Sequence, residues 1–267
     1  MAVNEKPPSI ITLTTDFGEG SRYIAAMKGV ILSINPAARL IDLSHSVPAQ
    51  DVLRGAIALA EATPYFPAKT IHVAVVDPGV GTARRIVYAR IGSQQFVAPD
   101  NGLLARLAAE AAPSKIICLD RREFWLPHVS NTFHGRDIMA PVAARLSLGL
   151  SPDELGSPLE SLVPLAWPEA EKVANRITGE VVEVDSFGNL LTNITREMLA
   201  GVPTDELVTI TCDEHATQGI FQTYSEQPPM TLIALVGSGG TLELAIVEEN
   251  ASAMLGVRAG APVVITW

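Results

Sequence analysis

Two hydrophobic patterns alternate through the first 150 residues of the chain. Residues 10–14 form a continuous apolar run typical of a buried strand, and Ile24, Met27 and Ile31 follow at helical spacing until Pro36 ends the pattern. Later segments repeat this order: a helix capped by Asp51, a strand at 71–76, a helix over 101–112, a strand at 115–119 and a helix beginning near Gly135. This alternation predicts an α/β domain with a mainly parallel sheet flanked by helices.

The pattern changes in the second half. Residues 150–176 contain four prolines and no sustained period, which is typical of a linker. From Arg176 onward short strands separated by turns follow one another: GEVVEVD, NLLTNI, ELVTITC, TLIALV, TLELAIV and PVVITW. We therefore expect an N-terminal α/β domain over residues 1–165 and a smaller, antiparallel β-barrel-like C-terminal domain over residues 166–267.

Composition narrows the class of protein. Hydrophobic residues make up 48% of the 267 residues and charged residues 18%, which excludes a disordered chain. The formal net charge of −10 argues against a nucleic-acid partner, because phosphate contacts need clustered basic side chains. A net negative charge would tolerate a cationic small-molecule ligand, although a need for solubility alone also explains the charge.

Nothing in the chain indicates secretion or membrane insertion. The two cysteines are too few for a disulfide framework, the N-terminus lacks the basic and apolar regions of a signal peptide, and no uncharged run is long enough to span a bilayer. We expect a soluble, cytoplasmic protein with no membrane partner.

Acidic residues stand at the predicted strand ends. Asp16 and Asp77 both follow apolar strands, and ligands of parallel sheets gather beyond such ends. Each also has a purely structural interpretation, since Asp16 could cap the next helix and Asp77 could belong to an ordinary turn. The glycine-containing loop after Asp77 has neither the lysine of a P-loop nor a dinucleotide-binding spacing.

A histidine at a helix start is the clearest base candidate. The positive end of the helix dipole lowers the pKa of His134, so that the ring can accept a proton, although a structural hydrogen bond is the alternative. Asp137 stands three residues later and could share a metal with it, but no second His or Cys pair supports a metal site. The segment Asp185–Asn189 has the residue types of a hairpin turn. These patterns indicate an enzyme-like chain without naming a reaction.

The motifs taken in order carry a family resemblance. They are TTDFG with AAMKG, SVPAQD, VVDPGVGTARR, APDNGLL, NTFHGRDIMAPVAARL, VDSFGNLLTNI and GSGGTLELAIVEENASA. The chain closely resembles the S-adenosyl-L-methionine hydrolases, also called S-adenosylmethionine hydroxide adenosyltransferases, which are relatives of the bacterial fluorinase and chlorinase. Any single motif is weak, but the resemblance runs from about residue 10 to the C-terminus.

The resemblance implies a reaction and an assembly. Water or hydroxide attacks the ribose 5′ carbon of S-adenosyl-L-methionine and releases adenosine and L-methionine, without a metal or other cofactor. The residues that prepare the water fall on Asp77, Arg84 and His134, and the halogenating relatives carry Tyr in place of Asp77 and His134. A homotrimer is implied, with substrate between the N-terminal domain of one subunit and the C-terminal domain of its neighbour.

The resemblance also implies which residues bind the substrate. Asp16 holds the ribose 2′ and 3′ hydroxyls, Asp185 and Asn189 hold the methionine portion, and Ser238 with backbone near Ala251 meets the adenine. The remaining substrate contacts fall on Ser21, Gln50, Gly135, Phe187 and Glu243.

Two departures and two alternative functions accompany the resemblance. Ser21 replaces an Asp common in relatives, and Gly239 replaces an Arg of the fluorinase, so substrate affinity and tolerance are left open. A halide-using adenosyl transferase is one alternative, but the carboxylate of Asp77 would repel halide. A non-catalytic module that binds adenosine or S-adenosylmethionine is the other, and it would need none of the water-preparing residues.

Overall fold

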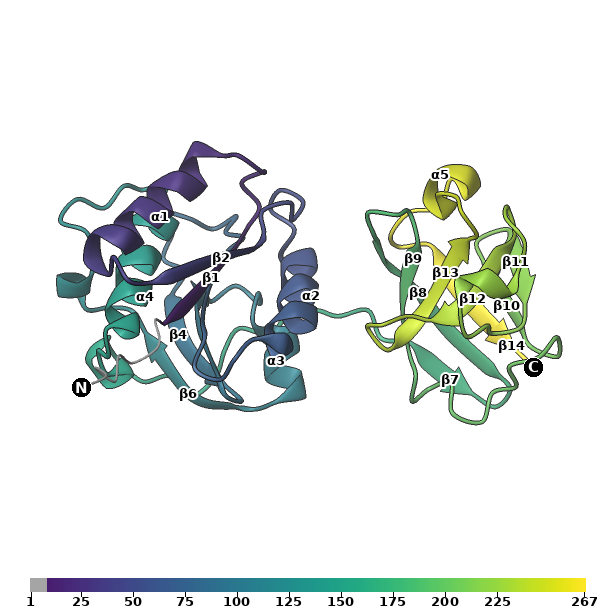
Figure 1. Ribbon diagram of the computed structural model, residues 1–267. Coiled ribbons are helices and arrows are strands. Elements are labelled where there is room, and N and C mark those ends of the chain that lie inside the picture. The colour runs from purple at the N-terminus through teal and green to yellow at the C-terminus, as the bar shows by residue number, and fades with distance from the viewer. Residues whose placement is uncertain (1–8) are drawn as a thin grey trace, which may run out of the picture. The chain divides into compact units, whose positions relative to one another are not determined.

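The computed structural model of the protein describes residues 9–267 and divides the chain into two compact units, one ending at Leu165 and the other spanning Ala166–Trp267 (Figure 1). Each unit has its own hydrophobic core.

The first unit is built on a six-stranded sheet in the order β2-β1-β3-β5-β4-β6. Its strands are β1 Ile10–Thr15, β2 Arg39–Ser44, β3 Ile71–Val75, β4 Ile86–Ile91, β5 Gln94–Pro99 and β6 Pro113–Cys118. The pairs β1–β2, β1–β3 and β3–β5 are parallel, whereas β4 pairs antiparallel with β5 and β6. The mainly parallel sheet predicted from the sequence is therefore confirmed, with an antiparallel edge in addition.

Helices cover both faces of this sheet. They are α1 Arg22–Ile34, α2 Val52–Ala62, α3 Ala105–Glu110 and α4 Ala140–Ser147, and a π-helical turn over Gly135–Met139 leads into α4. α1 and α4 pack on one face and α2 and α3 on the other (Figure 1). Successive side chains of β3 point to opposite faces of the sheet. Val73 and Val75 pack in the hydrophobic cluster with α1 and α4, whereas Ala74 packs in the cluster on the other face.

The helix predicted over 101–112 is shorter than expected. The side chain of Asn101 donates to the carbonyl of Val76 at 2.9 Å and accepts from the N–H of Leu103 at 3.2 Å. These bonds hold residues 101–104 in a turn, so α3 begins at Ala105.

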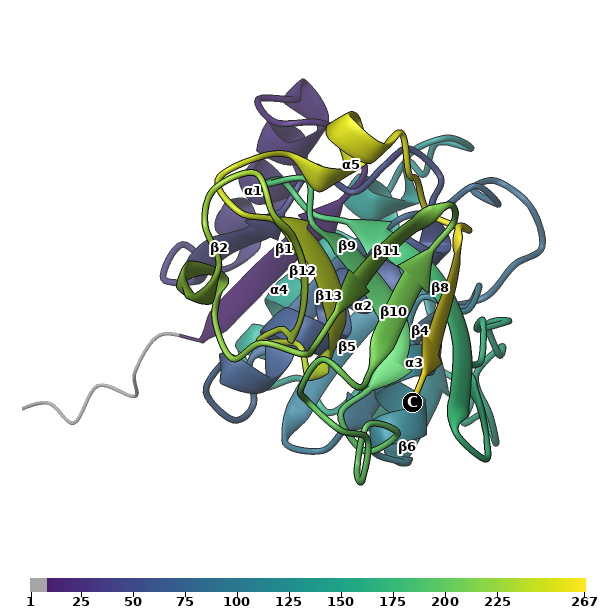
Figure 2. The same ribbon diagram turned by 90° about the vertical axis from the view of Figure 1, so that its right-hand side faces the viewer.

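The second unit is an antiparallel sheet with strand order β11-β10-β14-β8-β9-β13-β12, and β7 pairs with β8. The strands are β7 Glu171–Val173, β8 Arg176–Val184, β9 Leu190–Thr195, β10 Thr209–Cys212, β11 His215–Gln218, β12 Leu232–Val236, β13 Thr241–Ile246 and β14 Pro262–Thr266, and α5 spans Ala251–Leu255. The Thr217 hydroxyl donates to the Leu232 carbonyl at 2.7 Å and so links the two end strands. The result is the nearly closed barrel that was predicted, and Figure 2 shows β10 between β11 and β14.

One prediction is wrong in part. The stretch over residues 150–176 that was interpreted as a linker contains β7, which pairs with β8. Cys212 ends β10, and a two-residue turn joins it to His215, the first residue of β11. Within the described residues, no helix is long and apolar enough to cross a membrane.

Candidate active site

Parallel strands bring Asp16 and Asp77 to the same edge of the sheet. β1 and β3 are neighbours, with Thr15 opposite Val75 in register. Asp16 follows Thr15 directly, and Asp77 comes two residues after Val75. The strand-end position that the sequence suggested for both aspartates is therefore the carboxyl edge of one sheet.

Arg84 joins Asp77 to His134. Its Nε lies 2.8 Å from Oδ1 and 3.0 Å from Oδ2 of Asp77, and its Nη2 also contacts Oδ2. The same Nη2 lies 2.9 Å from Nδ1 of His134. Asp77 and Arg84 side chains are only 5% and 11% exposed, so the pair is largely withdrawn from water. One guanidinium thus organises the three residues that the resemblance assigned to water activation.

A glycine allows the loops that carry these residues to approach each other. Gly81 has φ +79°, and a Cβ at this position would lie 2.3 Å from the carbonyl oxygen of Asn131. A side chain at Gly81 would therefore push the Asp77–Arg84 loop away from the segment that leads into His134.

The surroundings of His134 keep its ring neutral. Burial lowers the pKa of His134 below its usual value, and the positive charge of Arg84 lowers it further. His134 stands at the start of the helical segment and makes no side-chain capping bond. Gly135 packs closely against Val75 and Met27, with a hypothetical Cβ 3.2 Å and 3.3 Å from their side chains. Its small size places the helix start against β3.

Asp137 is occupied by protein partners. It is fully buried, accepts from Arg136 Nε at 2.6 Å and from the N–H of Ser130 at 2.8 Å, and thereby holds the loop before His134. Among residues 9–267 no group of three His, Cys, Asp or Glu side chains has the arrangement of a metal site.

A cavity of about 760 Å³ borders this cluster within the first unit. Arg84 and His134 form part of its wall, together with Arg85, Trp125 and Asn131. The cluster is therefore reachable from a space large enough for a small molecule.

The predicted ribose-binding residue is held in a fixed orientation. Oδ2 of Asp16 accepts the backbone N–H of Gln50 at 2.8 Å, and Gln50 has an unusual positive φ of 66°. Ser21 accepts the N–H of Tyr23 and is the N-cap of α1, so capping by Asp16 is ruled out. Ser21 therefore has a local structural use at the position where the resemblance implied an Asp in relatives.

In the second unit, Asp185, Phe187 and Asn189 form one turn. Oδ1 of Asp185 accepts the backbone N–H groups of Phe187 and Asn189 at 2.9 and 2.8 Å, and Oδ2 accepts from Nδ2 of Asn189 at 3.0 Å. Asn189 is buried, whereas the Phe187 side chain is 76% exposed. The hairpin-turn interpretation is thus correct, and the turn holds a partly exposed carboxylate beside a buried amide.

Other predicted residues lie near this turn. Ala251 begins α5, and the N–H of Ser252 donates to the carbonyl of Gly188 at 2.9 Å, which ties α5 to the turn. Burial raises the pKa of Glu243, the hydrogen bond from Tyr224 opposes this rise, and the charge of Asp185 adds to it, so the two carboxylates interact electrostatically. Ser238 is exposed in the turn between β12 and β13.

Sequence reasoning missed one partner of Glu243. The Tyr224 hydroxyl donates to Oε1 of Glu243 at 2.5 Å, and Gly237 leaves the room that the carboxylate fills, since a Cβ there would meet Oε2 at 2.4 Å. Tyr224 stands in a short 3₁₀ turn over Tyr224–Glu226, which a capping box of Thr223 and Glu226 marks in the sequence. Its contact with Glu243 depends on the barrel fold.

Two family models match the chain. Residues 11–156 match the SAM hydroxide adenosyltransferase N-terminal domain, and residues 179–264 match the C-terminal domain of the same family. Together these matches cover most of both units.

Three individual proteins illustrate the similarity. The (R)-S-adenosyl-L-methionine hydrolase of Salinispora tropica is 40% identical over 257 residues, which cover 95% of this chain and 96% of that protein. A fluorinase of an Actinoplanes species is 29% identical and covers 73% of this chain and 74% of its own length. The crystal structure of an uncharacterized conserved protein from Thermotoga maritima has a TM-score of 0.91 at 35% identity and covers 96% of this chain and all of that one.

Proposed function

The chain belongs to the SAM hydroxide adenosyltransferase family, and from this premise we propose how it hydrolyses S-adenosyl-L-methionine to adenosine and L-methionine. The observation that carries the proposal is the arginine that bridges Asp77 and His134. Water, activated by these residues, attacks the ribose 5′ carbon, the carbon–sulfur bond breaks, and the electron pair leaves with methionine.

The sulfur of S-adenosyl-L-methionine is a positively charged sulfonium, and this charge determines which catalytic groups the reaction needs. Methionine leaves as a neutral thioether, so no acid has to protonate it and no metal has to stabilise a negative charge on it. The protein has to align the water and accept its proton. We therefore propose a metal-independent hydrolase.

The hydrogen-bond directions divide these tasks between two side chains. A guanidinium only donates, so Nδ1 of His134 accepts from Arg84 and the neutral ring carries its proton at Nε2. His134 then offers a donor to the water oxygen. The Asp77 carboxylate only accepts, and it takes the water proton while Arg84 keeps its orientation.

Substrate recognition follows the distribution of charges. Asp16, fixed by the N–H of Gln50, retains acceptor positions on both oxygens for the two ribose hydroxyls. Asp185 with the coupled carboxylate of Glu243 attracts the cationic methionine portion, and Nδ2 of Asn189 has a second N–H for its carboxylate. Ser238 and the start of α5 at Ala251 meet the adenine.

We also propose a homotrimer in which sites form between subunits. The catalytic and ribose-binding residues belong to the first unit, whereas the proposed methionine and adenine contacts belong to the second. A complete site therefore needs groups from two units, and the proposal takes them from neighbouring subunits.

Product analysis tests the proposed function. The protein is incubated with S-adenosyl-L-methionine with and without chloride or fluoride, and again after thorough chelation. We expect adenosine and L-methionine in every case. A 5′-halo-adenosine would favour the halide-using alternative, no product would favour a binding module, and a chelation loss restored by Zn²⁺ or Mg²⁺ would disprove metal independence.

A further inference from the structure

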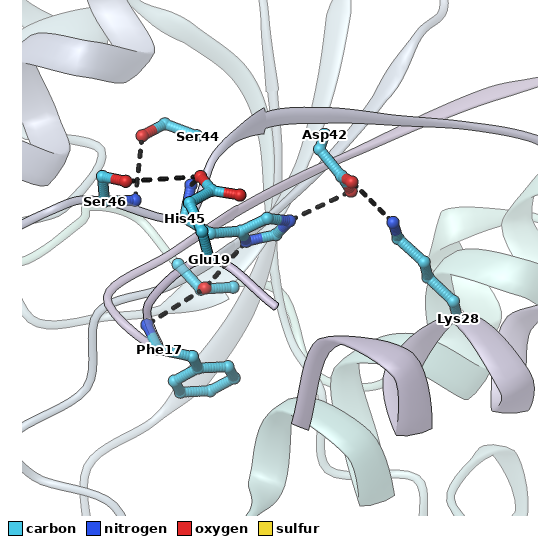
Figure 3. A network of polar contacts seen from close by, with 8 residues as sticks. Phe17, Glu19, Lys28, Asp42, Ser44, His45 and Ser46 are labelled. Carbon is cyan, nitrogen blue, oxygen red and sulfur yellow. Dashed lines mark hydrogen bonds and ion pairs between the residues drawn. The ribbon is translucent and has the colours of Figure 1, made fainter. Parts of the chain in front are cut away.

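A buried histidine that the reaction does not use lies beside the loop that carries Asp16 (Figure 3). His45 directly follows β2 and is 1% exposed. We propose that His45, through Thr15, is a positioning residue that fixes the Asp16 carboxylate for the ribose hydroxyls. This inference rests on the ribose-binding role proposed for Asp16.

The side chain of His45 reaches the residue before Asp16. Its Nδ1 lies 2.9 Å from Oγ1 of Thr15, the last residue of β1. The same hydroxyl oxygen accepts the backbone N–H of Phe17 at 3.2 Å. The Thr15 side chain therefore reaches past Asp16 to the backbone of Phe17. His45 fixes the rotamer of the hydroxyl that makes this contact.

The backbone of His45 holds the next part of the loop. Its carbonyl accepts the N–H of Gly18 at 2.9 Å, and its own N–H donates to Oε1 of Glu19 at 3.3 Å. Oε1 of Glu19 also accepts from the hydroxyl of Ser46 at 3.3 Å, as Figure 3 shows. One residue thus contacts the loop at positions 15, 18 and 19.

The carboxylate of Asp42 lies beside the ring of His45. Nε2 lies 3.0 Å from Oδ1 of Asp42, and Lys28 Nζ lies 2.5 Å from Oδ2 (Figure 3). Burial acts to raise the pKa of Asp42, but hydrogen bonds from Lys28 and His45 outweigh it and leave that pKa below its ordinary value. Nε2 makes no hydrogen bond that meets the geometric criteria, yet a carboxylate 3.0 Å from this nitrogen favours the proton there. The neutral ring then accepts the Thr15 hydroxyl proton at Nδ1.

The sequence of groups Asp42, His45 and Thr15 resembles a catalytic triad but cannot act as one. Thr15 is fully buried, and its oxygen already accepts the N–H of Phe17. A nucleophile needs an exposed oxygen within reach of the substrate. The arrangement therefore orders the loop and takes no part in bond breaking.

The connection between β2 and α2 holds Asp16 from a second side. His45 stands near its start, and Gln50, near its end, donates its backbone N–H to Oδ2 of Asp16. Backbone contacts at one end and a direct carboxylate contact at the other fix both the loop and the side chain.

The chain contains a matched control for this arrangement. Thr12, three residues earlier on β1, has its Oγ1 2.8 Å from Nδ1 of His72, and both residues are fully buried. His72 lies on β3 and stacks on Phe96 inside the core. A Thr→Val change at either position removes one buried Thr–His hydrogen bond from the same strand, and at position 15 it also removes the acceptor of the Phe17 N–H.

The test compares Thr15→Val with Thr12→Val in the full-length protein. The ratio of kcat/KM for S-adenosyl-L-methionine to that for its 2′-deoxy analogue is measured, together with the Kd of adenosine and 2′-deoxyadenosine. We expect Thr15→Val to lower the preference for the 2′-hydroxyl by about threefold to tenfold, the range of one hydrogen bond. Thr12→Val should leave this preference unchanged within about twofold while losing similar thermal stability.

Two substitutions of the histidine sharpen the result. Asn places an acceptor near the position of Nδ1, so His45→Asn should retain more of the preference than His45→Phe. The proposal is overturned if Thr15→Val, folded as judged by circular dichroism, keeps the wild-type preference, or if Thr12→Val loses as much of it. If wild type and Asp16→Asn both lack a preference for the 2′-hydroxyl, the ribose-binding role of Asp16 is wrong as well. This comparison therefore distinguishes failure of the proposed function from failure of the positioning role of His45.

Discussion

Nη2 of Arg84 lies 2.9 Å from Nδ1 of His134, and since a guanidinium has no acceptor, the histidine nitrogen must accept. This contact determines the tautomer of His134, which the position of the ring alone would not show. It also explains why protonation of His134 is disfavoured, because a proton on Nδ1 would face a permanent positive charge.

The first prediction concerns the pH dependence of His134. Burial and then Arg84 lower its pKa below 6.5, so the ring is neutral at pH 7 and becomes protonated only under more acidic conditions. We expect kcat/KM to fall on the acid side, with a midpoint below pH 6.5 that coincides with the His134 titration measured by NMR. In Arg84→Gln the NMR midpoint should move to higher pH. A midpoint that stays in place would contradict the contact as the cause.

The second prediction separates Arg84 from its neighbour. Arg84→Lys keeps the charge but cannot hold Asp77 with two nitrogens while reaching His134, so we expect kcat to fall at least about tenfold. Arg85 also pairs with an aspartate, Asp100, with 2.5 Å between Nη2 and Oδ2. Steady-state kinetics of Arg85→Lys supply the control, and equal losses in the two variants would assign the effect to general disturbance of the loop.

The third prediction tests the shared site. By the proposed roles, Asp77→Asn should inactivate the first unit and Asp185→Asn should weaken the methionine contacts of the second, so each variant alone should have low activity. If sites form between subunits, unfolding and refolding the two variants together should restore activity in sites that combine two intact units. Mass measurement by light scattering checks the trimer. Absence of recovery in mixed trimers would mean that each site is built by one chain.

The fourth prediction concerns stability. Burial lowers the pKa of His72 from 6.5 to about 4, so the unfolded chain binds a proton in a range where the folded chain does not. His72 therefore has no effect on the free energy of unfolding above pH 6.5. As the pH falls toward 4, this residue lowers that free energy by about 3 kcal/mol. Urea unfolding of wild type and His72→Gln at pH 7 and pH 4.5 measures the difference. An equal pH dependence in both proteins would exclude His72 as its source.

Local patterns predicted the parts of the fold that depend on neighbouring residues. The N-cap of α2 is an example, because Asp51 accepts the N–H of Arg54 at 3.0 Å as its position suggested. The continuous apolar runs became β1 and β3. The antiparallel hairpin of β4 and β5 was not predicted, although its strands are apolar, because a hairpin breaks the alternation of strand and helix.

In the candidate active site, too, the sequence indicated the residues but not the contacts between them. Asp77, Arg84 and His134 were named through the family resemblance, and no residue spacing could show that Arg84 contacts both partners across 50 residues of sequence. The contact of Thr15 with His45 likewise depends on how β1 pairs with β2, whose register shifts between Leu13 and Thr14. Such contacts are consequences of strand pairing and were therefore beyond sequence patterns.

The central claim is that water attacks the ribose 5′ carbon, and hydrolysis in H₂¹⁸O tests it most directly. Mass spectrometry of the products should find one ¹⁸O atom in the adenosine, at the 5′ oxygen, and none in the L-methionine. Adenosine that lacks the label would contradict the account, because its 5′ oxygen would then have come from a source other than the water that Asp77, Arg84 and His134 are proposed to activate.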